Sequence, residues 1–330
     1  MAETEESSKP YRHVGVLGAG AWGTALAVVA AQSGRKVTLW ARNPASSSVR
    51  YARGSRAAPF VEAIELTAHR EKAEEAEAIL IAVPAQQLRS LLFKVPAHIA
   101  SPLVLCMKGI ERGTGKLVTE IAAEVREKSR FAILSGPSFA RNVMQGMPTA
   151  VTIAARASLA RRLQATLGNS AFRPYASEDM VGVALGGAAK NVYAIACGVV
   201  IGLGLGENAR AALLARSFAE LCRLGRSLGA RDETLTGLSG LGDLVLTATS
   251  ITSRNYAFGV SLGKGAELKG LVGPEAPLAE GVATAPALVQ RAQLLSIELP
   301  IAETVAEILS GALGPADAVP RLMTRPFKTE

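Results

Sequence analysis

The residue whose surroundings most clearly suggest chemistry is Lys190, the one lysine in a nearly uncharged run from about Val181 to Leu205. Helical spacing puts mostly small or apolar residues on its side of a helix: Val183, Gly186, Gly187, Ala194 and Cys197. Burying a charged ammonium among apolar side chains costs free energy, so such an amine gives up its proton more readily than one in water. An amine of this kind suits proton transfer. The alternative is a core-helix lysine whose ammonium reaches out to water.

Two later segments could serve the same chemistry. Asp243 follows a glycine-rich bend, and a carboxylate near Lys190 would hold and orient its amine. Ser253 suits a helix N-cap, with Arg254 and Asn255 opening the helix that follows. A helix N-terminus beside a guanidinium is a good phosphate site. A plain capped helix with a solvated arginine is the alternative.

A glycine motif near the start of the chain predicts a dinucleotide site. Gly18, Gly20 and Gly23 form G-x-G-x-x-G between an apolar strand at 13–17 and a helix at 24–30. The first glycine makes the tight turn, the second admits a pyrophosphate to the backbone, and the third lets helix and strand pack closely. The helix N-terminus then holds the anion with its N–H groups.

Other candidates follow strands. Arg42 comes just after the strand at 36–40, where a strict NAD enzyme usually carries an acid, so it predicts that NADP is accepted. A surface arginine is the alternative. Lys108 and the turn at 136–138 also follow apolar strands, and ligands of parallel sheets bind beyond those ends. Either could be an ordinary loop residue.

The elements that must position these residues change character along the chain. Strands alternate with helices up to about Ser177, which predicts a Rossmann-type, doubly wound, mostly parallel α/β sheet; helices alone then follow. Residues 44–77 give no clear pattern. We expect a loose tail at 1–11, a dinucleotide-binding domain at 12–177 and an all-helical substrate domain at 178–330. The expected elements are strands at 13–17, 36–40, 78–83, 103–107, 131–134, 149–153 and 171–175, and helices near 85–93, 114–128, 157–167, 179–201, 208–228, 254–262, 280–295 and 301–311.

Composition limits the class of protein. Hydrophobic residues make up 49% and charged residues 19%, which fits a globular chain. The net charge of +8 favours anionic ligands, with nucleic acid as the alternative. Because the basic residues are scattered, we favour small phosphorylated ligands and expect no nucleic acid. We read the apolar run as a buried helix with no stable membrane insertion. Three cysteines without C-x-x-C spacing fit a reducing cytoplasm, and no metal-ligand cluster is visible.

Seven blocks together resemble the bacterial NAD(P)-dependent sn-glycerol-3-phosphate dehydrogenases in order and spacing. The resemblance covers essentially the whole chain after residue 12. The blocks are GAGAWGTALA (18–27), KGI (108–110), SGPSFA (135–140), GGAAKNVYAIACG (186–198), GLGDLVLT (240–247), SRN (253–255) and AEG (279–281).

The resemblance implies a role for each matching residue. Lys190 would be the catalytic proton acceptor, with Lys108 and Asp243 beside it in the catalytic set. The substrate-binding set would be Lys108, Gly136, Ser138, Lys190, Asn191, Asp243, Thr247, Ser253, Arg254 and Asn255. The cofactor-binding set would be Gly18, Gly20, Ala21, Trp22, Gly23, Arg42, Lys108, Ala140, Arg254, Leu278 and Glu280. Family members often carry Ser at the position of Ala21 and usually Val at that of Leu278.

The implied activity is reversible hydride transfer between NADP or NAD and dihydroxyacetone phosphate, giving sn-glycerol 3-phosphate for phospholipid synthesis. A cytoplasmic homodimer is implied as well. Two rivals remain. A β-hydroxyacid dehydrogenase would need a carboxylate site in place of a phosphate site, and a nucleotide-sensing protein would have little use for Lys190, Asp243 and Arg254 together.

Overall fold

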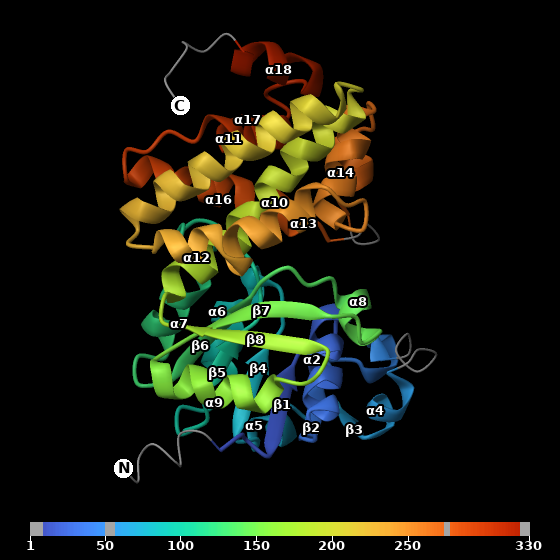
Figure 1. Cartoon of the computed structure of the whole chain (residues 1–330), viewed down its shortest axis with the longest axis vertical. Coiled ribbons are helices and arrows are strands. Elements are labelled where there is room, and N and C mark those ends of the chain that lie inside the picture. The colour runs from blue at the N-terminus through green and yellow to red at the C-terminus, as the bar shows by residue number, and fades with distance from the viewer. Residues whose placement is uncertain (1–8, 50–56, 274–277, 324–330) are drawn as a thin grey trace. The chain divides into compact units, whose positions relative to one another are not determined.

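The computed structural model describes residues 9–49, 57–273 and 278–323 (Figure 1). The chain forms two compact units, which are treated separately below. The first unit comprises Met1–Lys108 and Leu117–Ala184, and the second comprises Gly109–Lys116 and Leu185–Glu330. Of the tail expected at 1–11, residues 1–8 lie outside the described residues. Tyr11 is buried, and its backbone N–H donates to the Thr166 hydroxyl.

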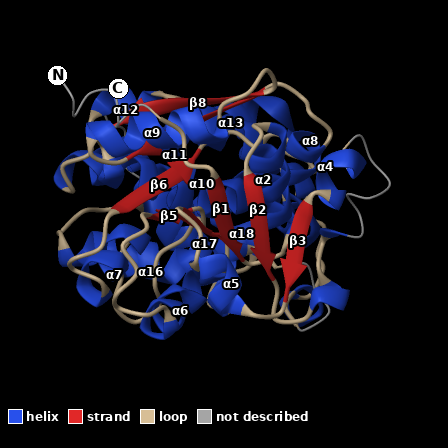
Figure 2. Cartoon of the chain, turned by 90° about the horizontal axis from the view of Figure 1, so that it is seen from below, coloured by secondary structure: helices blue, strands red, loops and turns tan. Residues whose placement is uncertain are grey.

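The first unit is built on one twisted sheet whose strands Figure 2 draws in red. Within the described residues it has eight strands in the order β3-β2-β1-β4-β5-β6-β7-β8. All neighbouring pairs are parallel except β6 and β7, which are antiparallel. The predicted α/β class is therefore confirmed. The strands are β1 (His13–Leu17), β2 (Lys36–Trp40), β3 (Ile64–Thr67), β4 (Ala78–Ile81), β5 (Leu103–Leu105), β6 (Phe131–Ser135), β7 (Thr149–Ala154) and β8 (Phe172–Ser177).

Burial explains which strands the sequence revealed. β4 and β5 are buried at every position, so they read as short continuous apolar runs. β3 is an edge strand with a buried, exposed, intermediate, buried pattern, and it lies in the segment 44–77 that showed no clear periodicity. Two short helices in the same segment were missed for the same reason, because five residues are too few to show a helical period.

The helices of the first unit pack on this sheet. They are α2 (Ala21–Gln32), α4 (Ala58–Glu62), α5 (Arg70–Glu74), α6 (Leu88–Lys94), α7 (Val118–Val125), α8 (Ala140–Met144) and α9 (Ala157–Leu167), with 3₁₀ turns η1 (Pro44–Ser46) and η2 (Ala85–Gln87). The helix expected at 114–128 is shorter than predicted. Gly113 and Gly115 have φ of 81° and 66°, a conformation that ends helical continuity, so α7 begins only after Leu117.

The second unit is helical in all the elements described for it, as predicted. Its elements are α10 (Met180–Gly202, from Leu185 onward), α11 (Gly206–Ser227), α12 (Asp232–Thr236), the π-turn η3 (Leu238–Gly242), α13 (Asp243–Ala248), α14 (Arg254–Gly263), α15 (Leu268–Leu271), α16 (Glu280–Leu294), α17 (Pro300–Ser310) and α18 (Pro315–Met323). The five long predicted helices are present within three residues of their expected ends. α12, η3, α13, α15 and α18 were not predicted.

The apolar helix α10 is the core element of the second unit. By length and composition alone it could cross a membrane, but 94% of its most apolar window is buried within the protein. A core helix has this pattern. Cys197 on α10 is buried, and burial raises the pKa of its thiol to about 12, so it is not poised as a nucleophile. Cys222 on α11 is only partly buried.

Candidate active site

The glycine motif forms a tight turn between β1 and α2. Gly18 has φ of 114°, and a Cβ atom there would lie 2.7 Å from the Ala82 carbonyl oxygen. At Gly23 a Cβ atom would lie 1.8 Å from the Gly18 carbonyl oxygen. Both positions therefore exclude any side chain, for the two separate reasons that the motif predicts: a left-handed turn and close packing of helix on strand.

Gly20 differs from the other two glycines because its missing side chain faces open space. A Cβ atom at Gly20 would have no heavy atom within 4 Å. Gly20 is also the N-cap of α2, it offers no side-chain cap, and the first helical bond runs from Thr24 N–H to the Gly20 carbonyl. The N–H groups of the first turn therefore have no intrahelical acceptor. This arrangement fits a pyrophosphate against the backbone.

The ends of β5 and β6 lie close together and carry polar groups. The Lys108 amine donates to the Gly136 carbonyl oxygen at 3.0 Å, and the Ser138 hydroxyl donates to the same oxygen at 2.9 Å. The Trp22 indole N–H donates to the Cys106 carbonyl at 3.0 Å, which fixes the ring beside the end of β5. The structure thus brings together the predicted residues of the first unit that follow these strands.

Arg42 and Ala140 have more open surroundings. Arg42 is exposed two residues beyond the end of β2. Its pairing with a 2′-phosphate stays a prediction. Ala140 is the first residue of α8, a short helix that packs against α2.

In the second unit, backbone contacts place α10 very close to its neighbours. A Cβ atom at Gly186 would lie 2.5 Å from the Ser239 carbonyl oxygen, and one at Gly198 would lie 2.2 Å from the Tyr256 carbonyl oxygen. Gly186 and Gly198 are therefore needed for the close approach of the neighbouring helices. This approach brings η3 and the start of α13 against the part of α10 that carries Lys190.

Lys190 is paired with a carboxylate and a hydroxyl in a buried site. Its amine donates to Asp243 Oδ1 at 2.6 Å and to the Thr247 hydroxyl at 2.7 Å. The side chains of Lys190 and Asp243 are only 9% and 1% exposed. Asp243 and Thr247 lie one turn apart on α13, so one short helix supplies both acceptors. The predicted carboxylate partner of Lys190 is present, and the solvated-lysine alternative does not fit this burial.

Next to this cluster, Asn255 links three helices. Its Oδ1 accepts the backbone N–H of Gly281 at the start of α16, and its Nδ2 donates to Asn191 Oδ1 on α10, both at 2.9 Å. The backbone N–H can only donate, which fixes the orientation of the Asn255 amide. Asn191 must then accept through its oxygen, and this orients its NH₂ group away from Asn255.

The start of α14 has the predicted cap. The Ser253 hydroxyl accepts the Tyr256 N–H at 3.3 Å, and Arg254 is exposed at the first helical position. Leu278 is 50% exposed, and Glu280 is the first residue of α16, beside the Gly281 that binds Asn255. Each predicted residue of the second unit therefore belongs to the Lys190 cluster, takes part in the Asn255 hydrogen bonds, or is close in sequence to a residue that does. Leu278 is the exception, because no described contact links it to the cluster.

Two buried residues of the second unit were not among the predicted site residues, although Tyr193 lies within the block at 186–198. Glu220 on α11 is 2% exposed, and burial raises the pKa of its carboxyl to about 7. Tyr193, one turn after Lys190, is fully buried, and burial followed by the charge of Glu220 raises its pKa well above the usual range. The available signal was helical spacing. Ser217, Leu221 and Leu224 define the inner face of α11, and Glu220 is an acid on that face.

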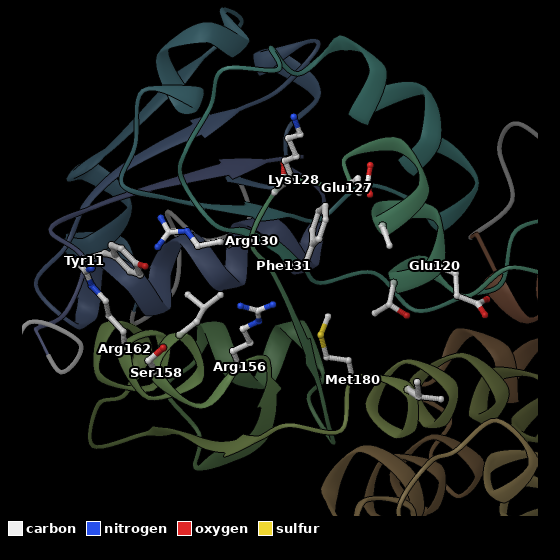
Figure 3. A pocket seen from close by; sticks show the side chains of 15 residues that line it. Tyr11, Glu120, Glu127, Lys128, Arg130, Phe131, Arg156, Ser158, Arg162 and Met180 are labelled. Atoms are coloured by element: carbon white, nitrogen blue, oxygen red, sulfur yellow. The ribbon is translucent and has the colours of Figure 1, made fainter. Parts of the chain in front are cut away.

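A hollow in the first unit does not involve the candidate residues. Its volume is about 840 Å³, and it is lined by residues of α7, α9, the start of β6 and the first turn of α10 (Figure 3). Arg156 points into it, while Arg130 donates to the Ala100 carbonyl at 2.8 Å. Within the described residues, no three His, Cys, Asp or Glu side chains group as a metal ion would require.

Comparison with known proteins identifies a family over both units. Residues 13–160 match the family described as NAD-dependent glycerol-3-phosphate dehydrogenase N-terminus, and residues 179–320 match its C-terminus. The chain is 51% identical over 331 residues to a glycerol-3-phosphate dehydrogenase (NAD(P)+) of Bradyrhizobium sp. strain ORS 278, covering 98% of this chain and 99% of that one. A relative from Rhodospirillum rubrum is 49% identical, over 96% of this chain and 94% of that one. A crystal structure of glycerol-3-phosphate dehydrogenase from Coxiella burnetii is 36% identical, with a TM-score of 0.88 and coverage of 96% and 99%.

Proposed function

The chain belongs to the NAD-dependent glycerol-3-phosphate dehydrogenase family, and from this premise we propose that it reversibly reduces dihydroxyacetone phosphate to sn-glycerol 3-phosphate. NADP and NAD are the proposed cofactors. The observation that carries the proposal is the Lys190 amine, buried and held at 2.6 Å from Asp243 and 2.7 Å from Thr247. A group placed in this way can give and take one proton at a fixed position.

The first unit supplies residues that fit a dinucleotide. Gly20 leaves room for a pyrophosphate against the backbone, and the first turn of α2 offers its N–H groups. The bound dinucleotide would supply or accept the hydride. Arg42 would pair with a 2′-phosphate. Trp22 and Lys108 are held near the ends of β5 and β6 by their hydrogen bonds, and there they would line the other end of the cofactor site.

The second unit supplies the proton and a phosphate site. In the reduction, the Lys190 ammonium gives a proton to the substrate oxygen as the carbonyl becomes an alkoxide; in the oxidation, the amine takes that proton back. Asp243 and Thr247 hold the amine in both directions. Arg254 and the first N–H groups of α14 would bind the phosphate, with Asn255 and Asn191 oriented by their bond to each other.

The family resemblance also supports a cytoplasmic homodimer that supplies glycerol 3-phosphate to glycerophospholipid synthesis. Size-exclusion chromatography with light scattering tests the oligomeric state. A monomer at micromolar concentration would contradict this part of the proposal without affecting the reaction.

The reaction is tested by nicotinamide absorbance at fixed enzyme concentration. Dihydroxyacetone phosphate is compared with a panel of small 2- and 3-keto acids, using NADPH and NADH in turn. Rapid oxidation of the nicotinamide with dihydroxyacetone phosphate alone is the expected result. Preference for a keto acid would indicate a β-hydroxyacid dehydrogenase, and no turnover with any substrate would indicate a nucleotide-sensing protein.

A further inference from the structure

The hollow of the first unit is large enough to hold a second ligand (Figure 3). Its volume of about 840 Å³ lies in the range of small-molecule sites, which is roughly 300–1,000 Å³. No residue assigned above to the cofactor or the substrate lines it. Part of its wall is apolar and consists of Phe131, Leu159 and Met180. The hollow is therefore a separate place in the first unit with the size and apolar surface of a ligand site.

Three arginines stand around this hollow. Arg130 comes from the loop before β6, while Arg156 and Arg162 come from α9, and Figure 3 shows Arg156 pointing into the open space. Within the described ranges, no ion pair joins any of the three to a carboxylate, whereas Arg70 and Arg89 elsewhere in the unit are paired with glutamates. Three guanidinium charges thus face one hollow without a counter-ion from the described chain.

The two acids in the lining do not neutralise these charges. The Glu120 carboxylate accepts the backbone N–H of Leu117 at 2.7 Å, so it caps the start of α7. Figure 3 shows the side chains of Glu127 and Lys128 pointing away from the arginines. The electrostatic character of the hollow is therefore set by the arginines, and it favours an anion.

Two of the arginines are held in place by the protein itself. The Arg162 guanidinium carbon lies 3.9 Å from the centre of the Tyr11 ring, and the Tyr11 backbone N–H donates to the hydroxyl of Thr166, one turn after Arg162. The Arg162 Nε is buried and has no hydrogen-bond acceptor among the residues described. Arg130 donates to the Ala100 carbonyl at 2.8 Å, which engages one of its five N–H groups. Side chains fixed in advance lose less entropy when a ligand binds.

We propose that this hollow binds an organic phosphate with two or more negative charges and an apolar or aromatic part. Guanidinium groups bind phosphate oxygens in pairs, and three of them favour a multiply charged anion over a single carboxylate. The apolar wall would contact a ring or an alkyl chain, which inorganic phosphate lacks. The first turn of α9 also lines the hollow, and its N-cap residue, Arg156, provides no side-chain cap for the free N–H groups.

The test measures ligand binding to the full-length protein by calorimetry. ATP is the organic phosphate probe, inorganic pyrophosphate is the anion without an apolar part, and adenosine is the ring without the anion. The variants Arg156→Gln and Arg162→Gln each remove one charge from the hollow. The matched control is Arg161→Gln, which removes the same charge from an exposed residue of α9 that does not line the hollow.

The expected result is that ATP binds the wild type and that each hollow variant weakens its Kd roughly tenfold to a hundredfold, the size of one charge-assisted hydrogen bond. The control Arg161→Gln should stay within about twofold of the wild type, because exposed charges outside the site are screened by salt. Pyrophosphate should bind more weakly than ATP, and adenosine should not bind. Turnover of dihydroxyacetone phosphate should be unchanged in all three variants, since none of these arginines belongs to the candidate active site.

Four results would overturn the inference. The same ATP affinity in the wild type and both hollow variants would place ATP elsewhere, for example at the glycine turn. Equal losses in the control and the hollow variants would show general attraction to positive charge. Pyrophosphate binding as tight as that of ATP would exclude a role for the apolar wall, and no ATP binding at millimolar concentration would exclude the site.

These outcomes are independent of the proposed function, because binding is measured without substrate. A wild type that does not reduce dihydroxyacetone phosphate but binds ATP in the hollow refutes only the proposed function. If circular dichroism shows that Arg162→Gln does not fold, Arg156→Gln decides the question, because Arg156 is exposed at the end of α9 and packs on no aromatic ring in the described structure.

Discussion

Replacing Lys190 with alanine removes a proton donor and also the amine that neutralises Asp243. The two effects act on different quantities. Loss of a general acid lowers turnover by roughly 10²–10⁴. Loss of the counter-ion leaves a carboxylate whose side chain is 1% exposed, and breaking such a buried pair costs about 3–5 kcal/mol of folding free energy. The variant should therefore be nearly inactive and also clearly less stable.

The assay separates these effects. Turnover is measured at a temperature where the variant is folded, NADPH binding is measured by fluorescence, and unfolding is followed in urea. Binding of the dinucleotide should be nearly unchanged, because the glycine turn belongs to the first unit. The double variant Lys190→Ala/Asp243→Ala should regain part of the stability, since no buried charge is left unpaired, but none of the turnover.

Two results would refute the reasoning. Turnover above about a tenth of wild type in Lys190→Ala would mean that another group transfers the proton. Unchanged stability would mean that Asp243 is neutral or finds a new partner when the amine is absent. Lys190→Arg is a useful control, because it keeps a cation near Asp243 while its guanidinium does not release a proton at ordinary pH.

Arg42→Ala should weaken NADPH binding selectively, by about 1.5–3 kcal/mol if its bonds to the 2′-phosphate are charge-assisted; equal losses for NADH would show that Arg42 does not read that phosphate. Arg254→Ala should reduce kcat/KM far more for dihydroxyacetone phosphate than for dihydroxyacetone, and Arg254→Lys should remain impaired because the planar fork is lost; the same factor for both substrates would place the phosphate elsewhere. Gly23→Ala should destabilise the first unit and abolish dinucleotide binding, since its Cβ would lie 1.8 Å from the Gly18 carbonyl oxygen; a stable, cofactor-binding variant would contradict the packing described. Burial raises the pKa of Glu220 from 4.5 to about 7 in the folded state, so the free energy of unfolding should fall as pH rises from 4.5 through 7, because the folded state then holds a proton that the unfolded state has lost. Urea titrations of Glu220→Gln should lack this part of the fall. A pH profile identical to that of the wild type would show that Glu220 is not responsible for the fall.

The parts of the fold that the sequence predicted are those with strong local patterns. Fully buried strands such as β4 gave short apolar runs, and long helices such as α10 and α16 gave segments too long to be strands. The missed elements are short or lie at an edge. β3 has one partner strand and a partly exposed face, and α12 and α15 have five and four residues, so local pattern could not distinguish them from loop.

The sequence by itself determined the glycine turn and the isolated amine. A G-x-G-x-x-G motif between strand and helix depends on backbone conformation over a few residues, and a lone lysine in an apolar helix is visible from helical spacing alone. Both are properties of neighbours along the chain, so no knowledge of packing was required to find them.

Only the tertiary structure decided which groups face one another. Lys190 meets Asp243 across 53 residues, and Glu220 meets Ile301 across 81. Such pairs depend on how close two helices approach and on their rotation about their own axes. In the Lys190 cluster, that approach is set by glycines that leave no room for a Cβ atom. A carboxylate near the lysine could be expected from the sequence, but its distance of 2.6 Å and its burial follow from the packing of α10 against η3 and α13.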